Sequence, residues 1–176
     1  MHGVPTRRCP GYTVRAGLPD TLTPVRVSAK SDYALRALIE LAVNQDGAPV
    51  SAEELGKRQD IPHGFLQAIL ADLRRAGVVL SHRGQAGGWR LSRPPETVTV
   101  ADVIRAVDGP LVSVHGHRPE AVSYNASAEV LQHVWIAARS SLREVCEQVT
   151  LQSLAERRLP PAVAARTEDE DAWQPH

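Results

Sequence analysis

Apolar residues recur every three or four positions over residues 28–44, which predicts an amphipathic helix. Ser51 and Glu54 have the spacing of a capping box, so a short second helix is expected from Ser51 to about Gln59. A turn at residues 60–62 follows, and a second apolar stripe predicts a third helix that Gly77 ends. This stripe consists of Leu66, Ile69, Leu70 and Leu73. Two short helices joined by a tight turn are typical of a helix-turn-helix.

Two short segments of β-forming residues come next, VVLSHRG at 78–84 and GWRLS at 88–92. The glycine-bearing turn between them predicts a β-hairpin. A further helix is expected over residues 98–107, with Thr99 as its cap. A helix-turn-helix followed by a hairpin is a winged helix, which we place at residues 27–108.

The rest of the chain alternates irregular and helical segments. Residues 109–126 lack periodicity and are expected to form a loop, a candidate sensing region. Residues 127–159 predict a long helix and a short terminal helix; the apolar stripe of the long helix exceeds what a small winged domain covers, which indicates dimerisation. The expected fold class is therefore mainly α: a winged helix-turn-helix with a small β-hairpin wing and a long C-terminal dimerisation helix.

The two ends of the chain lack a periodic apolar pattern. Residues 1–26 carry four prolines and are interpreted either as a disordered arm or as sequence upstream of the natural start. Residues 160–176 begin with two prolines and are rich in acidic residues, so a disordered acidic tail is expected.

The formal net charge of the 176 residues is zero, which argues mildly against a nucleic-acid partner. The distribution of charge argues for one, because residues 73–95 contain five arginines and no acidic residue. Cys9 and Cys146 are far apart and form no CxxC motif, which favours a reducing compartment, the cytoplasm. The chain has no run of 18 apolar residues and no G-x-S-x-G or H-E-x-x-H motif, so neither a membrane partner nor an enzyme is expected.

The loop SHRGQAGGWRLSRP at 81–94 has three competing interpretations. A phosphate cradle requires a Lys-Ser or Lys-Thr pair and a following helix, and the loop has neither. A plain hairpin turn explains the glycines, because glycine tolerates positive φ, but not the basic residues around them. A DNA-binding wing explains both, since arginine enters narrow minor grooves.

Three motifs together resemble the Rrf2 family of bacterial winged-helix transcription regulators over about residues 27–159. They are DYALRAL at 32–38, R-G-x-x-G-G-aromatic at 83–89 and VADVIRAVDGP at 100–110, with the helix-turn-helix between the first two. The resemblance implies a sequence-specific repressor that binds a palindromic operator in double-stranded DNA as a homodimer. The third helix would then enter the major groove and the wing the adjacent minor groove, with the long helix as dimer stem.

The resemblance also suggests which residues contact DNA. The family's S-Y-L-E segment is Gly64-Phe65-Leu66-Gln67 here, and Gln67 suits adenine where a glutamate would suit cytosine. Arg83 matches the wing arginine, whereas Gln85 departs from the usual proline and Trp89 from the usual tyrosine; Trp89 is expected to pack under the wing. With two candidate phosphate contacts added, Lys30 and Ser51, the expected DNA-binding residues are Lys30, Ser51, His63, Gly64, Phe65, Gln67, Arg83, Gly84, Gln85, Gly87 and Gly88.

Some members of this family hold an iron–sulfur cluster through three cysteines in the loop after the DGP segment. Residues 111–126 contain no cysteine, and Asp32, which matches a carboxylate ligand of some members, cannot hold a cluster alone. We therefore expect no cofactor and no metal, and the effector stays unknown. Two alternatives stay open: a metal- or thiol-responsive sensor that uses His115 and His117 or Cys146, and a winged helix that contacts only proteins.

Overall fold

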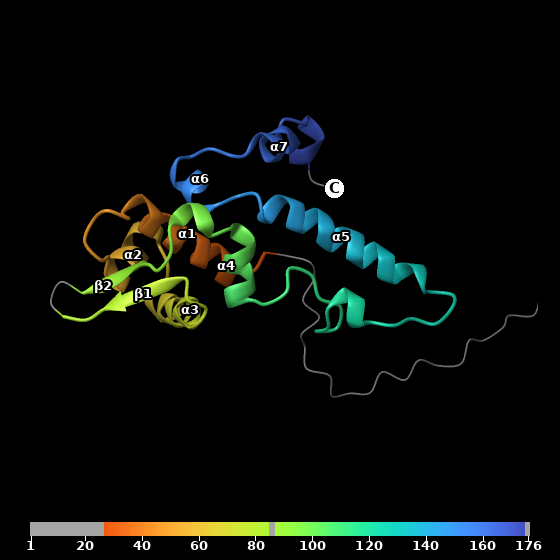
Figure 1. The fold of residues 1–176 in the computed structure, drawn as a ribbon, viewed down its shortest axis with the longest axis horizontal. Helices are drawn as coiled ribbons and strands as arrows, with labels where there is room; N and C mark the ends of the chain where they lie inside the picture. The colour runs from red at the N-terminus through yellow and green to blue at the C-terminus, as the bar shows by residue number, and fades with distance from the viewer. Residues whose placement is uncertain (1–26, 85–86, 175–176) are drawn as a thin grey trace, which may run out of the picture.

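A computed structural model describes residues 27–84 and 87–174, and in this part of the chain the fold is mainly helical with one β-hairpin that projects from one end (Figure 1). The expected arm at residues 1–26 lies outside the described residues. The helix-turn-helix consists of α1 (Ala29–Val43), α2 (Ala52–Gln59) and α3 (His63–Arg75). The wing consists of β1 (Val79–His82) and β2 (Gly88–Leu91), and α4 (Val100–Val107) follows it. The winged helix expected from the sequence is confirmed.

The core forms where the apolar faces of α1, α3 and α4 meet, as their spacing predicts. The third-helix stripe is fully buried, and so are Leu38 of α1 and Leu55 of α2. Helix caps fix where these elements begin: the Ser28 hydroxyl accepts from the N–H of Ser31, and Thr99 and Asp102 cap α4 reciprocally. The capping box expected at Ser51 forms only by half, because Ser51 accepts from the Glu54 N–H while the Glu54 carboxylate pairs with Arg58.

The wing is a two-stranded antiparallel hairpin in which Ser81 pairs with Trp89 and His82 with Gly88. A third segment joins its free edge, because Val50 and Trp89 exchange two backbone hydrogen bonds of 3.1 and 2.8 Å. The wing is thereby attached to the residue before Ser51, at the start of α2. Trp89 is partly buried against the core, as expected.

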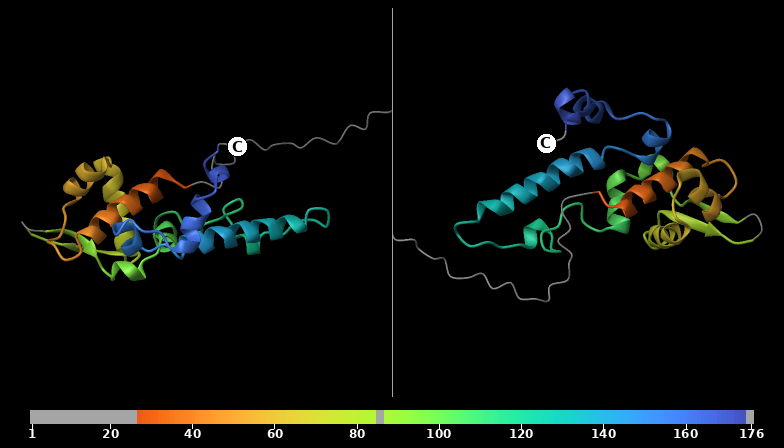
Figure 2. Two further views of the ribbon diagram at one scale, coloured as in Figure 1. Left: turned by 90° about the horizontal axis from the view of Figure 1, so that it is seen from above. Right: turned by 180° about the vertical axis from the view of Figure 1, so that it is seen from behind.

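The long helix α5 (Val130–Cys146) projects from one end of the molecule, while the wing projects from the other (Figures 1 and 2). It is shorter than the expected 127–149, and none of its residues is buried. A loop with a 3-10 turn, η2 (Pro119–Ala121), packs on one side of it. The Gln132 side-chain amide holds this loop by donating to the carbonyl oxygens of Val122 at 2.7 Å and Pro119 at 3.2 Å.

After α5 the chain returns to the winged helix through α6 (Leu151–Ala155). We expected this segment to belong with the dimerisation helix, but it packs against α1, and Leu151 is fully buried. Backbone hydrogen bonds of 2.9 Å, Val100 N–H to Val149 and Leu151 N–H to Val98, fasten it beside α4. The winged domain is therefore completed by residues that follow the long helix.

The expectation of disorder over residues 160–176 is wrong for the part that the structure describes, which extends to residue 174. This part forms α7 (Pro161–Ala164) and two 3-10 turns, η3 (Ala165–Thr167) and η4 (Glu170–Trp173). Val163 is buried, and Arg166 forms a 3.0 Å ion pair with Glu144 of α5. These contacts attach the segment to the rest of the protein, which its acidic composition does not predict.

The helices in residues 27–84 and 87–174 are each too short or too polar to span a membrane.

Candidate nucleic-acid interface

The third helix divides into a buried face and an exposed face. Its apolar stripe is fully buried, while the opposite face exposes residues of the first two turns. These exposed residues are His63, Gly64, Phe65, Gln67 and Ala68. The structure therefore brings together every major-groove residue expected from the sequence. A helix anchored this way can enter a DNA groove without losing core packing.

Phe65 is the large apolar side chain of this face and is 59% exposed. Its ring contacts Tyr33 of α1 edge-to-face, with 6.4 Å between ring centroids, and the Arg36 guanidinium lies 5.5 Å from the Tyr33 centroid. This stack, which the sequence did not predict, orients the Phe65 ring. An exposed aromatic edge of this kind can contact the methyl group of thymine.

Gly64 and Gln67 both lie on the exposed face of α3. The Gln67 amide nitrogen lies 3.4 Å from His63 Nε2, and in the described residues we find no second partner for Gln67. A Cβ placed on Gly64 would meet no atom within 4 Å, so space is not what requires glycine there. A Gln side chain can bond adenine through both its amide atoms, so base reading by Gln67 stays a prediction that its exposure on α3 allows.

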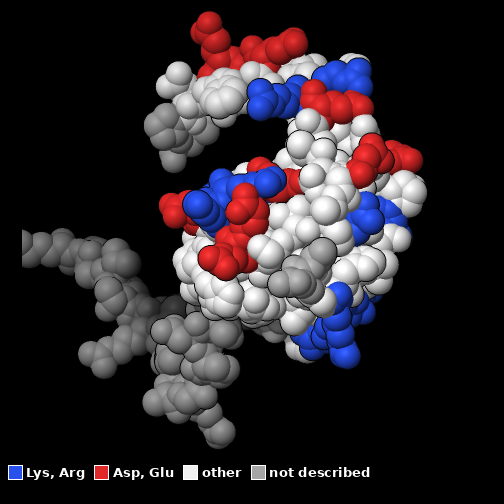
Figure 3. Space-filling view, turned by 90° about the vertical axis from the view of Figure 1, so that its left-hand side faces the viewer, with Lys and Arg blue, Asp and Glu red and all other residues white. Residues whose placement is uncertain are grey.

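Arg83 lies at the end of the wing, exposed, and forms no hydrogen bond or ion pair with any residue that the structure describes. Figure 3 faces the wing end and shows a group of basic side chains at its lower edge with no acidic side chain drawn beside it. Arg74, in the last turn of α3, is also exposed without a described partner. In the sequence, Arg74 is only one of the five arginines of residues 73–95. Its place in the last turn of α3 makes it a candidate phosphate contact.

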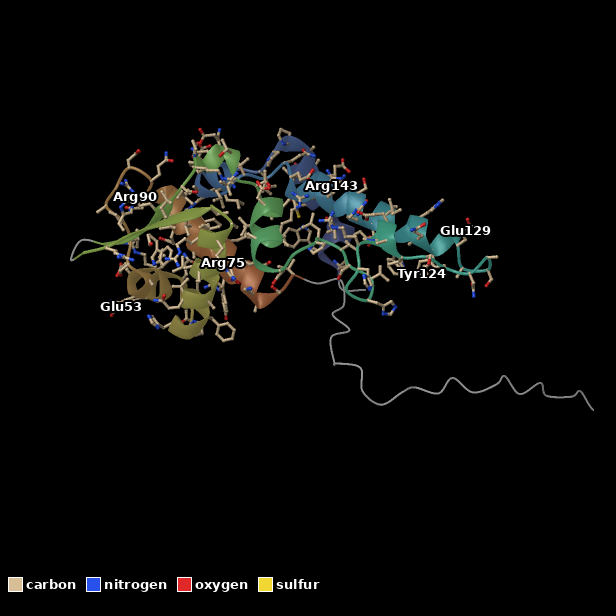
Figure 4. The ribbon with its side chains drawn as sticks, turned by 60° about the horizontal axis from the view of Figure 1, so that its bottom comes forward. Glu53, Arg75, Arg90, Tyr124, Glu129 and Arg143 are labelled. Atoms are coloured by element: carbon tan, nitrogen blue, oxygen red, sulfur yellow. The ribbon has the colours of Figure 1, made fainter. Side chains whose placement is uncertain are left out.

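Arg90 has a structural role instead, although the sequence grouped it with Arg83. Its guanidinium donates to the carbonyl oxygens of Gly47 at 2.7 Å and Gln45 at 3.1 Å, and so holds the loop between α1 and α2. Figure 4 shows Arg90 beside this loop, well away from Arg75 at the end of α3. Arg90, one of the basic residues around the wing, therefore stabilises the fold.

The wing glycines have reasons within the protein. A Cβ on Gly88 would lie 2.6 Å from the backbone of Val50, and one on Gly87 would lie 2.4 Å from the His82 carbonyl oxygen. Gly84 has φ of +107° with open space around it. Gly87 and Gly88 are therefore required by close approach within the protein, while the contact of the three glycines with the DNA backbone stays a prediction. Gln85 lies outside the described residues.

The two expected phosphate contacts differ in their surroundings. Ser51 is exposed at the N-terminus of α2, where backbone N–H groups favour an anion, although Glu53 and Glu54 in the same turn oppose one. Lys30 does not join the interface: its Nζ atom lies 2.6 Å from Asp72 and donates to the Val107 carbonyl at 2.7 Å. Because these partners hold its charge inside the domain, the structure argues against Lys30 as a phosphate contact.

The candidate sensor residues are dispersed. His115 and His117 are exposed on a tight turn closed by Val114, and among residues 27–84 and 87–174 no three potential metal-binding side chains gather. Burial raises the pKa of the Cys146 thiol, with the Glu147 carboxylate adding to this and Arg105 opposing it. A raised pKa disfavours the reactive thiolate at neutral pH.

The family model and the named relatives that match this chain are all transcriptional regulators. The family model for Rrf2, described as iron-dependent transcriptional regulator, matches residues 27–157. The Mycobacterium tuberculosis protein named Putative HTH-type transcriptional regulator Rv1287 is 41% identical over 82% of this chain and 90% of its own. The regulator CymR of Bacillus subtilis is 31% identical over 74% of this chain and 90% of its own. The solved structure of that CymR, titled the global cysteine regulator of that organism, covers 75% of this chain and 97% of its own, with 30% identity and a TM-score of 0.65.

Proposed function

The chain belongs to the Rrf2 family of transcriptional regulators, and on that premise we propose that this DNA-binding regulator acts as a homodimeric repressor on a palindromic operator. The exposed face of α3 would read the major groove and Arg83 would enter the adjacent minor groove. The observation that carries the proposal is that one packed core presents both the exposed face of α3 and Arg83, a wing arginine without a partner among the described residues. Family relatives named as regulators, not enzymes, agree with the absence of hydrolase motifs.

The dimer is supported by the apolar surface of α5. Val130 is 73% exposed and Val134 is 51% exposed, while Leu131 and Leu142 are also exposed and lie on one face of the helix. The loop around η2 covers the adjoining edge of this stripe through Trp135, whose Nε1 donates to the Tyr124 hydroxyl at 3.1 Å, and through Gln132. A second α5 packed on the open stripe would cover it and relate two α3 helices by a two-fold axis.

The family description includes iron dependence, but the donor atoms of this chain do not fit an iron–sulfur cluster. Such clusters are held mainly by cysteine thiolates, and the loop at 109–126 contains no cysteine. Asp32 is exposed and lies 3.5 Å from the Arg36 guanidinium, and Cys146 is on α5 with a raised thiol pKa. The proposal assigns no role to iron, and it places the protein in the cytoplasm, where bacterial DNA lies.

Selection of bound duplexes from a random DNA library tests the proposal. We expect enrichment of one palindromic sequence whose half-sites lie about one helical turn apart, and retention that falls steeply with salt as counterions are released. A winged helix that contacts only proteins would enrich no sequence and would show no salt-dependent retention. Enrichment of a single, non-repeated half-site would reject the dimeric arrangement while keeping DNA recognition.

A further inference from the structure

We propose that a cleft between α4, the loop that follows it and α5 binds a small organic anion that carries phosphate or carboxylate groups. The cleft has a volume of about 390 Å³, within the range of small-molecule sites. Four arginines line it: Arg105 from α4, Arg118 from the loop, and Arg139 and Arg143 from α5. Figure 4 shows Arg143 on α5 near the winged domain, whereas Tyr124 and Glu129 mark the far end of the helix.

The positive charge of this cleft exceeds what nearby carboxylates neutralise. Glu120 is the one acidic residue among those that line the cleft, and it pairs with Arg139. Arg105 and Arg143 share Glu147, and Arg105 also lies 3.7 Å from Asp102, but neither of these carboxylates lines the cleft. The two arginines hold the pKa of the Glu147 carboxyl below its usual range.

The Arg118 side chain adds a further positive charge, because among the described residues it forms neither a hydrogen bond nor an ion pair. After a backbone hydrogen bond and the side chain of Arg139, its charge helps to hold the pKa of the Glu120 carboxyl below its usual range. Each guanidinium carries five N–H donors, so donors stay free on the paired arginines as well. An anion with several oxygens is the ligand whose charge and acceptors match this surplus.

Besides the ion pairs of Arg139 with Glu120 and of Arg105 with Glu147, interactions that do not use the arginines hold the cleft walls in place. Gly109, which lines the cleft, has φ of +93° and turns the chain away from α4, and Pro119 is fully buried. Gln132 and Trp135 fasten the loop to α5 through the hydrogen bonds described above. A preformed wall lowers the ordering cost of binding, which favours a small rigid ligand over a flexible peptide.

A continuous set of bonds links the cleft to the recognition helix. Asp108, next to Gly109, accepts a 2.6 Å hydrogen bond from the buried Ser31 of α1. The Val107 carbonyl accepts from Lys30, which pairs with Asp72 of α3. A ligand that shifts the end of α4 therefore acts on α1, and through the Lys30–Asp72 ion pair it acts on α3. This regulatory step, unlike the binding site itself, rests on the proposed DNA-binding function.

Calorimetric titration of the full chain without DNA tests the site. Inorganic pyrophosphate and citrate are the two probes, with ionic strength matched and sucrose as a neutral control. We expect saturable binding of at least one anion, one per chain, with a Kd below about 1 mM. The probe that binds more tightly identifies phosphate or carboxylate as the preferred group.

Substitutions locate the binding. Arg118→Gln removes a side chain that has no hydrogen bond or ion pair with residues 27–84 or 87–174, so the fold should persist. We expect Kd to rise about tenfold, as for loss of one charge-assisted hydrogen bond. Arg139→Gln should act in the same direction. Arg157→Gln, an exposed arginine outside the cleft, is the matched control and should leave Kd unchanged.

No saturable binding of either anion would overturn the proposal, as would an unchanged Kd in Arg118→Gln or an equal loss in Arg157→Gln. Operator affinity measured with the anion at saturation then tests the regulatory step separately. Anion binding without any change in operator affinity would reject regulation through α4, while failure to bind any operator would reject the proposed function and leave the site intact.

Discussion

The Nζ atom of Lys30 lies 2.6 Å from Oδ2 of Asp72, so an ion pair joins the first helix to the recognition helix. The pair is half-buried, with 35% of the Lys30 side chain and 16% of the Asp72 side chain exposed. The same ammonium group also donates to the Val107 carbonyl at the end of α4. Lys30 thus connects three helices of the domain, where the sequence suggested a contact with phosphate.

We predict that Lys30→Met lowers the free energy of unfolding by about 1–2 kcal/mol, the sum expected for one partly exposed ion pair and one hydrogen bond. Urea denaturation followed by circular dichroism measures the loss. The slope of log affinity against log salt for operator DNA should match that of the unaltered protein. A slope shallower by about one unit would return Lys30 to the DNA interface.

Gly88→Ala and Gly84→Ala should separate close packing from backbone conformation. A Cβ on Gly88 would lie 2.6 Å from the Val50 backbone, so we expect a loss of about 1–3 kcal/mol in stability and disruption of the wing edge. Gly84 has open space and only a positive φ to resist the change, so about 1 kcal/mol is expected. Thermal unfolding ranks the two variants, and equal melting temperatures would contradict the explanation.

Charge on the open stripe of α5 should abolish the proposed dimer. Leu131→Glu combined with Leu142→Glu places two carboxylates where apolar surfaces would meet, so a mass of one chain is expected by light scattering at micromolar concentration. Ser140→Glu, which lies on the side of α5 opposite Leu131, is the control and should remain dimeric. A single-chain mass for the unaltered protein would reject the dimer itself.

The Cys146 thiol should react slowly. Because burial raises its pKa, the thiolate fraction is reduced at neutral pH and grows only as pH rises above the range of an ordinary thiol. In a Cys9→Ser variant, where Cys146 is the one remaining cysteine, modification by a disulfide reagent should be slower than that of free cysteine at pH 7 and accelerate with pH. Rapid modification at pH 7 would revive the thiol-sensor alternative.

The sequence predicts those elements that depend on local spacing. The buried stripe of α3 follows from apolar residues three and four positions apart. The hairpin between Val79 and Leu91 follows from two β-forming segments around a glycine-bearing turn, and both elements form as expected. α5 is shorter than its apolar pattern at both ends, where residues 126–129 and 147–148 form turns and not α-helix. The periodicity shows which residues favour a helix, but it does not show at which residue the helix begins or ends.

Roles that depend on tertiary partners could not be predicted. Lys30 and Arg90 look like other exposed basic residues until Asp72 and the loop carbonyls are brought beside them. Likewise, the sequence does not show whether Gly87 and Gly88 are needed for a close approach inside the protein or for one to DNA. Arg83 remains a predicted DNA contact, since sequence and structure agree only that it is exposed and without a described partner.

Operator affinity of Arg83→Ala at several salt concentrations tests the central claim most directly, with Arg157→Ala as a control that removes equal charge elsewhere. We predict that Arg83→Ala weakens binding by about 1–3 kcal/mol and makes the salt slope shallower by about one unit. Gln67→Ala should instead relax the preference at one base pair per half-site and leave the slope unchanged. With the folds verified by circular dichroism, operator binding by Arg83→Ala that equals the unaltered protein at every salt concentration would show that the wing is only a turn and contradict the account.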